Sequence, residues 1–422
     1  MARTMTPKDA HVIINAIAAD VLGKNATLTA VDSSTFVSVG EMLLRGDKTN
    51  VYNALSYVIG RTFTAVRPYK GKFYVVDEID AGLYGQRIRK ISYAEDGALS
   101  AGAFNTDLNG ANLKDGAENT SVGTLDGGAN SATGSQWEQH QKTPIEFFFG
   151  GSSVWQYSIT RYEDQIKGAF ASEDAFIAFI EGMMTEAYND IETEKEAFRR
   201  LTVLNHISGV LDMGSSMPGS SVNLTAMFNA KFGTTYTTAD LLSTYLEDFL
   251  KFFVSVVKIN SDMMTNRSMK YHWNPVSGAG KYLTRHTPKD RQKLVLLNPL
   301  ITEAQSFVYP SLFNPEYIKI ENFEGVDYWQ NINVPMAIDW TPAIPDTSDP
   351  TTQTAGAQVQ ALIVGMLFDK DACVTNVQLE AAESTPLEAR KRYRNIWWTF
   401  AKNAVNDFTE NAVVFYMADP TP

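Results

Sequence analysis

The feature that most constrains the fold is one long helical pattern over residues 172–209. Ser172 is a suitable N-cap, and Gly209 is suited to end the helix in a left-handed conformation. At about 1.5 Å per residue, this helix spans roughly 55 Å. An ordinary long core helix would show the same pattern. The apolar side chains recur at steps of three and four residues, which places them on one stripe; they are Phe176, Phe179, Ile180, Met183, Ala187, Ile191, Phe198, Leu201 and Leu204.

Length and charge narrow the class of protein. The chain has 422 residues, enough for two or three domains. Its formal net charge of -12 argues against a domain that reads nucleic acid, because phosphate binding relies on clustered Lys and Arg. An acidic container around packed DNA remains compatible with this charge. No run approaches the ~20 apolar residues of a spanning helix, and the N-terminus lacks the apolar core of a signal peptide. We therefore expect no membrane association and assembly in the cytoplasm of the cell that makes the protein.

Shorter elements precede the long helix. The sequence predicts helices over residues 7–23 and 50–59, and strands over 62–66, 73–79, 86–93, 145–149 and 154–159. Between the third and fourth strands, residues 94–136 are rich in Gly, Asn, Ser, Thr and Asp and cannot bury a core. We therefore expect two strand-bearing arms joined by a long exposed tip.

Helices and strands mix after the long helix. We expect helices over residues 224–232 and 238–258, and strands over 294–297 and 317–320. Four further strands are predicted over 359–368, 374–379, 393–400 and 412–417. The predicted fold class is α+β.

The sequence offers no case for catalysis. The five histidines lie on different elements without metal-ligand spacing, and Cys373 is the single cysteine, which excludes an internal disulfide. Residues 278–281 lack the first glycine of a phosphate loop, because position 275 is Pro. Asp107 begins a segment that matches a calcium loop in composition alone. We predict no catalytic residue, no cofactor and no metal, and hence no enzyme.

One carboxylate pair and the single cysteine also have ordinary explanations. Glu192 and Glu196 sit one helical turn apart, which suits a solvated face as well as a catalytic pair. Cys373 is predicted to be a buried structural thiol in a strand. Both observations are consistent with a protein that is not a catalyst.

Charge is divided between the arm and the long helix. Basic residues dominate the arm over 61–93, and acidic residues dominate the helix over 172–198. An ordinary hydrated surface would carry the same charges. The sharper hypothesis is that the arm of one subunit lies across the helix of a neighbour, where complementary charge sets the register. The candidate interface residues are Arg87, Arg89 and Lys90 on the arm and Glu186, Asp190 and Glu194 on the helix.

The order of these elements resembles a known family. Residues 147–198 run from an arm strand into the long helix, Asp369, Lys370 and Asp371 follow an apolar strand, and Asn411 leads into the last strand. In this order they resemble a tailed-bacteriophage major capsid protein of the HK-97 type, particularly that of small short-tailed phages with protein-primed replication. The resemblance covers about a third of the chain.

The resemblance implies a domain organisation. Residues 1–30 would form an N-terminal arm and 67–150 an extended β-hairpin loop. A peripheral domain would comprise 31–66, 151–211 and 366–422, with the spine helix at 172–209. An axial domain would comprise 212–365.

The resemblance also implies partners. Copies of the chain would form pentamers and hexamers of an icosahedral shell around packaged double-stranded DNA, without sequence-specific contacts. The short N-terminal helix implies a separate scaffolding protein, and the family implies a portal protein and head fibre or decoration proteins. The location would be the virion, assembled in the bacterial host cytoplasm.

Two alternatives stay open. An encapsulin-like nanocompartment shell would share the fold and enclose a cargo enzyme. A carbohydrate-binding protein would use Trp397 and Trp398, yet adjacent strand residues point to opposite faces and cannot form one stacking platform.

Overall fold

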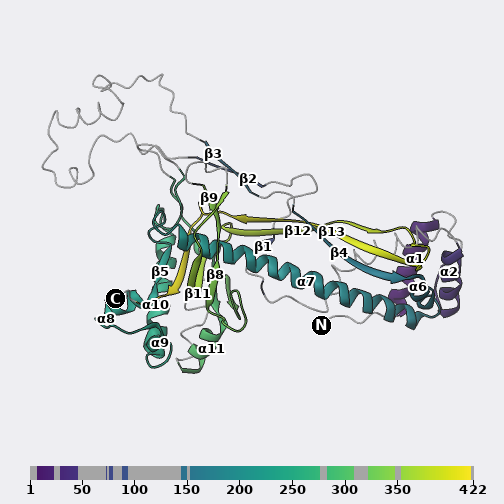
Figure 1. The fold of residues 1–422 in the computed structure, drawn as a ribbon, viewed down its shortest axis with the longest axis horizontal. Coiled ribbons are helices and arrows are strands. Elements are labelled where there is room, and N and C mark those ends of the chain that lie inside the picture. The colour runs from purple at the N-terminus through teal and green to yellow at the C-terminus, as the bar shows by residue number, and fades with distance from the viewer. Residues whose placement is uncertain are drawn as a thin grey trace, which may run out of the picture.

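A computed structural model describes residues 7–22, 29–45, 73, 76–78, 88–93, 144–149, 153–275, 283–307, 322–346 and 353–419. Helices and strands both contribute large parts of it, which confirms the α+β class. One helix, α7 (Glu173–Asp212), runs along most of the long axis (Figure 1). The predicted helix over 50–59, the strands over 62–66 and 317–320, the tip over 94–136, Asp107 and the glycine loop at 278–281 lie outside the described residues.

Helix α7 confirms the main prediction from the sequence. It has 40 residues, and the Ser172 side chain caps it by accepting a hydrogen bond from the Ala175 amide at 3.1 Å. The prediction that Gly209 ends the helix was wrong, because α7 continues to a cap at Met213. Gly209 has a packing role instead. A Cβ at that position would lie 2.4 Å from the Phe408 ring.

Two glycines of α7 should therefore respond in opposite ways to alanine. Gly182 has open space around its would-be Cβ, so Gly182→Ala is expected to stabilise the protein by about 0.5–1 kcal/mol. Gly209→Ala gains the same helix propensity but must displace the buried Phe408 ring, and overpacking costs about 1–3 kcal/mol. Urea unfolding of both variants measures the difference. Equal shifts in the same direction would show that Phe408 yields freely.

A four-stranded sheet runs beside α7. Its order is β1 (Asp77–Glu78), β12 (Cys373–Ser384), β13 (Tyr393–Asn406) and β4 (Ser153–Tyr162). The antiparallel pairs β12–β13 and β13–β4 account for most of its length. The predicted strands at 154–159, 374–379 and 393–400 are confirmed, and each extends further than predicted.

A second, six-stranded sheet lies at the C-terminal end of α7. Its members are β5 (Ser221–Asn223), β14 (Ala412–Met417), β11 (Val359–Asp369), β6 (Gln292–Leu297) and β7 (Asn322–Val326), with β8 (Ala337–Trp340) paired to β11. All six residues of β6 are buried. Strands β14 and β11 each have a neighbouring strand on both sides. Their central position explains why both are runs of mainly apolar residues. A small separate pair joins β9 (Ala343–Pro345) and β10 (Gln353–Ala355).

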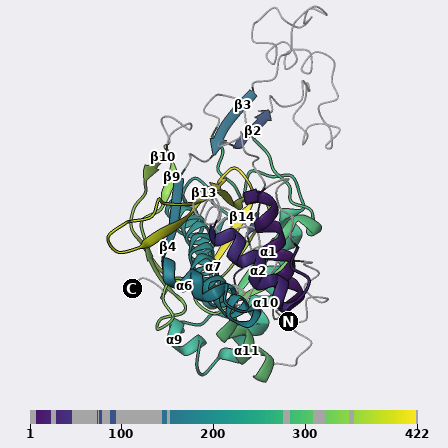
Figure 2. The ribbon, with the colours of Figure 1, turned by 90° about the vertical axis from the view of Figure 1, so that its right-hand side faces the viewer.

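Three short helices cover the N-terminal end of α7. They are α1 (Pro7–Leu22), α2 (Ser33–Arg45) and α6 (Glu163–Ala169), as Figure 2 shows end-on. Helix α2 is not predicted from the sequence, because its Ser, Thr, Val and Gly residues are weak helix formers. Burial of Phe36, Val39 and Leu43 in a shared core with α7 stabilises it. His11 also contacts the first turn of α7, with its Nε2 2.6 Å from Glu173 Oε1.

Four helices pack around the six-stranded sheet at the other end. They are α8 (Leu224–Phe232), α9 (Thr238–Leu241), α10 (Leu246–Met264) and α11 (Asn298–Phe307). The single helix predicted over 238–258 was wrong, because the chain breaks between α9 and α10. The Tyr245 ring, at the break, stacks on Tyr236 with centroids 4.0 Å apart. This tertiary contact opposes a continuous helix.

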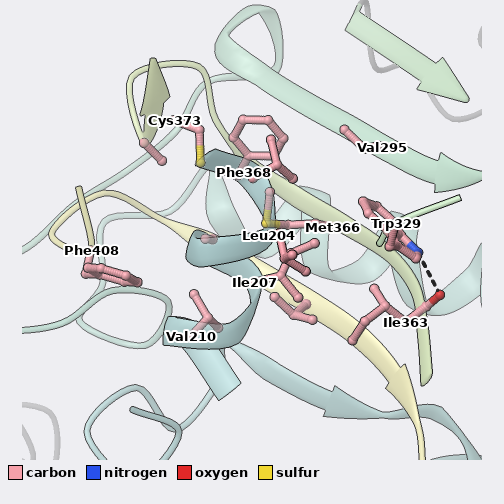
Figure 3. Close-up of a cluster of buried hydrophobic side chains, with 14 of the residues drawn as sticks. Leu204, Ile207, Val210, Val295, Trp329, Ile363, Met366, Phe368, Cys373 and Phe408 are labelled. Carbon is pink, nitrogen blue, oxygen red and sulfur yellow. Dashed lines mark hydrogen bonds between the residues drawn. The ribbon is translucent and has the colours of Figure 1, made fainter. Parts of the chain in front are cut away.

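The C-terminal half of α7 shares a core with the six-stranded sheet. Figure 3 shows Leu204, Ile207 and Val210 of the helix facing Met366 and Phe368 of β11. Trp329 closes the cluster, and its indole nitrogen donates to the Ile363 carbonyl at 2.9 Å. Cys373 lies in the same core, which confirms that its thiol is buried. Helix and sheet are therefore held together by apolar contacts.

His206 should make the stability of this core depend on pH. Burial lowers its pKa from 6.5 to about 4, while the Asp407 carboxylate acts in the opposite direction. The unfolded chain takes up this proton at a higher pH than the folded chain does. The free energy of unfolding should therefore fall as the pH drops from 6.5 towards 4, by on the order of 3 kcal/mol for this group.

His206→Phe should flatten that part of the profile, because a phenyl ring keeps the stacking on Phe408 without a titrating group. Urea titrations at pH 7 and pH 5 test this. The same loss of stability between the two pH values in both proteins would assign the pH dependence to other groups.

Candidate assembly interface

A two-stranded ribbon lies at the upper edge of the molecule in Figures 1 and 2. It consists of β2 (Ile88–Tyr93) and β3 (Pro144–Phe149). In its antiparallel register, Arg89 faces Phe148 and Ile91 faces Glu146, whereas Lys90 faces Phe147. Because side chains alternate along a strand, the ribbon has two distinct faces. We call them the outer face, with Arg89 and Ile91, and the inner face, with Lys90.

The outer face exposes large apolar side chains. Ile91 is 47% exposed, Phe148 is 52% exposed and Tyr93 is 59% exposed. Arg89 lies among them and forms an ion pair with Glu146 on the opposite strand. Several exposed apolar side chains gathered on one face of a strand pair favour a site of interaction.

The inner face packs on the body of the same chain. Phe147 is buried in the core that α7 shares with the sheet, and Ile145 and Phe149 pack against that core. Lys90 forms ion pairs with Asp407 and with Glu410, the latter at 2.5 Å. Lys90, a candidate for contact between subunits, is thus engaged within its own subunit.

The acidic candidates lie along α7. Asp190 is exposed, and its Oδ2 accepts a hydrogen bond from the Tyr157 hydroxyl at 2.8 Å. Glu194 is exposed one turn further on. Arg87 and the side chain of Glu186 lie outside the described residues.

Glu194 lies at the edge of a groove between α7 and the four-stranded sheet. The groove has a volume of about 250 Å³. Its apolar lining comes from Trp155, Phe198, Leu201 and Val377, and its charged lining from Glu194, Lys195 and Lys402. An apolar floor with a charged rim suits the docking of a protein surface.

Sequence reasoning missed the groove and the apolar outer face. The groove draws residues from α7 and three separate strands, so no local pattern reveals it. The outer face could have been found, because Ile91 and Tyr93 alternate with Lys90 and Ser92 along one predicted strand.

Glu192 and Glu196 do not form the solvated face considered from the sequence. Both are buried. Glu192 pairs with Lys195 at 3.6 Å, and Glu196 pairs with Arg200 at 2.8 Å. Each carboxylate thus has its own cation on the same helix.

The described side chains show no metal-binding constellation. Within the described ranges, no group of three His, Cys, Asp or Glu residues is arranged to hold an ion. Burial raises the pKa of the Cys373 thiol, which disfavours the reactive thiolate. None of the helices in the described part of the chain is long and apolar enough to cross a bilayer.

Comparison with known protein families identifies the family of this chain. The sequence model of the Phi29-like phage major capsid proteins matches residues 128–416. The chain belongs to this family. This capsid protein is therefore a structural component of the phage head, located in the virion, and it assembles with copies of itself. The match does not favour the encapsulin or carbohydrate-binding alternatives.

Solved structures of low sequence identity resemble this capsid protein in fold. One is the capsid of Staphylococcus phage Andhra, with 12% identity, 83% of this chain and 84% of that chain covered, and a TM-score of 0.48. Another is a chain from the structure of the head fiber and inner core protein gp22 of native bacteriophage P68, with 10% identity, 82% and 84% coverage, and a TM-score of 0.47. No curated protein sequence matches the chain significantly.

Proposed function

We propose that the chain is a major capsid protein of the HK-97 type that builds the icosahedral head of a small short-tailed phage with protein-primed replication. The observation that supports this most directly is the family match over residues 128–416. The order of ribbon, long helix and closing strands agrees with it. The head would enclose double-stranded DNA without sequence-specific contacts, in keeping with the net charge of -12.

We propose the domain division expected from the sequence, with one change. Residues 1–30 form the N-terminal arm, 67–150 the extended loop and 212–365 the axial domain. The peripheral domain takes 31–66, 151–211 and most of 366–422. Strand β14 pairs with β5 and β11 in the six-stranded sheet, and β11 runs on to Asp369, so we assign residues 366–369 and 412–417 to the axial domain.

We propose that the outer face of the ribbon docks into the groove beside α7 of a neighbouring subunit. Ile91, Tyr93 and Phe148 would lie on the apolar floor of Trp155, Phe198 and Leu201. Arg87 and Arg89 would face the acidic side of the helix, where Glu186, Asp190 and Glu194 lie. Apolar burial would supply affinity, and complementary charge would set the register. Lys90 no longer belongs to this proposal, because its partners are in its own chain.

The remaining partners are proposals of the same kind. Pentamers and hexamers of the chain would close the shell around a portal protein, with a separate scaffolding protein and with head fibre or decoration proteins. Assembly would take place in the cytoplasm of the bacterial host, without membrane contact.

Electron microscopy of the protein expressed alone and with its neighbouring gene products tests the proposed function. We expect closed, uniform shells, either from the chain alone or once the scaffolding protein is supplied. A monodisperse monomer under every condition would contradict the proposal. Shells that always enclose a cargo enzyme, from a gene with no portal beside it, would favour the nanocompartment instead.

A further inference from the structure

The turn between the last two long strands receives contacts from several elements that are distant in sequence. We call this turn, residues 407–411, the strap. It connects β13 of the four-stranded sheet to β14 of the six-stranded sheet. The ribbon, helix α7 and the segment 283–287 all contact it. The strap is therefore placed to relate the position of the ribbon to that of the helix.

Four charged groups join the ribbon to the strap. Lys90 of the ribbon lies between Asp407, which is 2% exposed, and Glu410. Arg285 approaches the same Glu410 oxygen as Lys90, with its Nε 3.5 Å from Oε1. Two cations and two carboxylates thus balance one another. We call this set the ionic cluster.

Arg285 contacts the ribbon as well as the strap. Its Nε donates to the Thr409 carbonyl at 3.1 Å, and its Nη2 donates to the Ser92 hydroxyl at 2.7 Å. The inner face of the ribbon is therefore attached at two neighbouring alternate positions, Lys90 and Ser92. Two attachments along one strand define a direction, whereas one would act as a pivot.

The strap is attached to α7 on its other side. The ring of Phe408 stacks on His206 with centroids 4.8 Å apart and an interplanar angle of 6°. The absence of a side chain at Gly209 gives the ring its place. The Phe408 carbonyl accepts a hydrogen bond from the Trp273 amide at 2.8 Å. Because these contacts attach the strap to α7, the strap keeps its position when the ribbon tilts.

Removing one member of the ionic cluster should have a local effect. Without Lys90, the buried Asp407 carboxylate loses its cation and Glu410 is left with Arg285, which is unfavourable in a poorly solvated site. The hydrogen bonds between β2 and β3 would be untouched. The ribbon should therefore stay paired while it loses its fixed direction.

We infer that the ionic cluster of Lys90, Arg285, Asp407 and Glu410 is a lock that fixes the direction of the ribbon relative to α7. With the lock closed, the outer face is presented at one angle. With the lock open, the intact pair of strands tilts about the apolar contact that Phe147 makes with the core. The lock is a property of the single chain and does not depend on the proposed function. Its consequence for docking between subunits does.

Two spin labels on the full-length chain test the lock. One replaces the exposed Tyr93 on the outer face (Tyr93→Cys), and the other replaces the exposed Val12 on α1 at the N-terminal end of α7 (Val12→Cys). The native Cys373 is fully buried and should remain unlabelled. The distance distribution between the labels is measured by pulsed electron resonance on soluble subunits, kept below the concentration at which they assemble.

Lys90→Met is the test variant, since it removes the charge and keeps the apolar stem. Arg89→Met is the matched control, because it removes a charge from the next residue, on the outer face, whose partner Glu146 is in the ribbon itself. We expect the distribution to become at least twofold wider in Lys90→Met and to stay narrow in the parent and in Arg89→Met. Lys90→Arg should restore the narrow distribution.

A narrow distribution in Lys90→Met would overturn the lock, and so would equal broadening in Arg89→Met. Circular dichroism and the melting temperature establish that each variant is folded. Should Lys90→Met fail to fold, Asp407→Asn combined with Glu410→Gln removes both carboxylate partners of Lys90 with little change of shape, and a narrow distribution in that variant would also overturn the inference. Shell formation is scored separately by microscopy, so failure of the proposed function and failure of the lock give different results.

Discussion

Arg87→Glu combined with Arg89→Glu is expected to reduce shell assembly at least tenfold. In the proposed docking, the double change turns the positive side of the outer face negative and places it against the acidic side of α7. Arg89 also loses its ion pair, so Glu146 and the new carboxylate repel each other on the same face. Like charges held opposite one another at an interface cost several kcal/mol, which exceeds the margin of one weak contact between subunits. Sedimentation velocity and electron microscopy measure the yield of shells.

A second set of changes in the same protein makes this result specific. Reversal of Glu186, Asp190 and Glu194 to Lys should restore part of the assembly, because it restores opposite charge across the contact. Lys251→Glu is the control, since Lys251 is an exposed cation on α10, outside the proposed contact, that pairs with Glu247 one turn away. Normal assembly by the double arm variant would refute the proposed contact. If the combined variant recovers no assembly, the loss in the double arm variant is a general effect of charge and not the loss of a direct pairing between the two surfaces.

Trp398→Ala is expected to destabilise the protein by about 3–5 kcal/mol, whereas Trp397→Ala should cost less than about 1 kcal/mol. Trp398 is fully buried and lies in the core that α1, α2 and α7 share with the sheet, with its ring 6.0 Å from that of Tyr157. Trp397 is 37% exposed. Urea unfolding monitored by circular dichroism measures both changes.

The comparison of the two tryptophans also bears on the carbohydrate-binding alternative. The two rings lie on opposite faces of β13, as strand geometry predicted. Equal destabilisation by the two substitutions would mean that Trp397 is covered by a contact outside the described residues or by a neighbouring subunit. Unfolding below and above the assembly concentration distinguishes these two cases.

Local pattern accounts for much of the fold. The spacing of apolar residues predicted α7, and Ser172 predicted its N-cap. Alternation predicted β4, and short apolar runs predicted β3 and the four closing strands. These features depend on contacts between residues three or four apart, or on which face of a strand is buried, so they are written into short stretches. The failures have a common cause. Helix α2 forms in spite of weak propensity, and the helix over 238–258 breaks in spite of a strong pattern, because tertiary packing outweighs both.

The candidate interface divides in the same way. The sequence by itself determined that the arm is basic, that the long helix is acidic and that no catalytic constellation is apparent. Only the tertiary structure decided that Arg89 faces outwards while Lys90 turns inwards to Asp407, a residue 317 positions away in the chain. Only the tertiary structure formed the groove beside α7 and gave Gly209 its role against Phe408. The physical reason is that composition and periodicity report the environment of a residue along its own element, whereas a partner from a distant strand is chosen by how the elements pack.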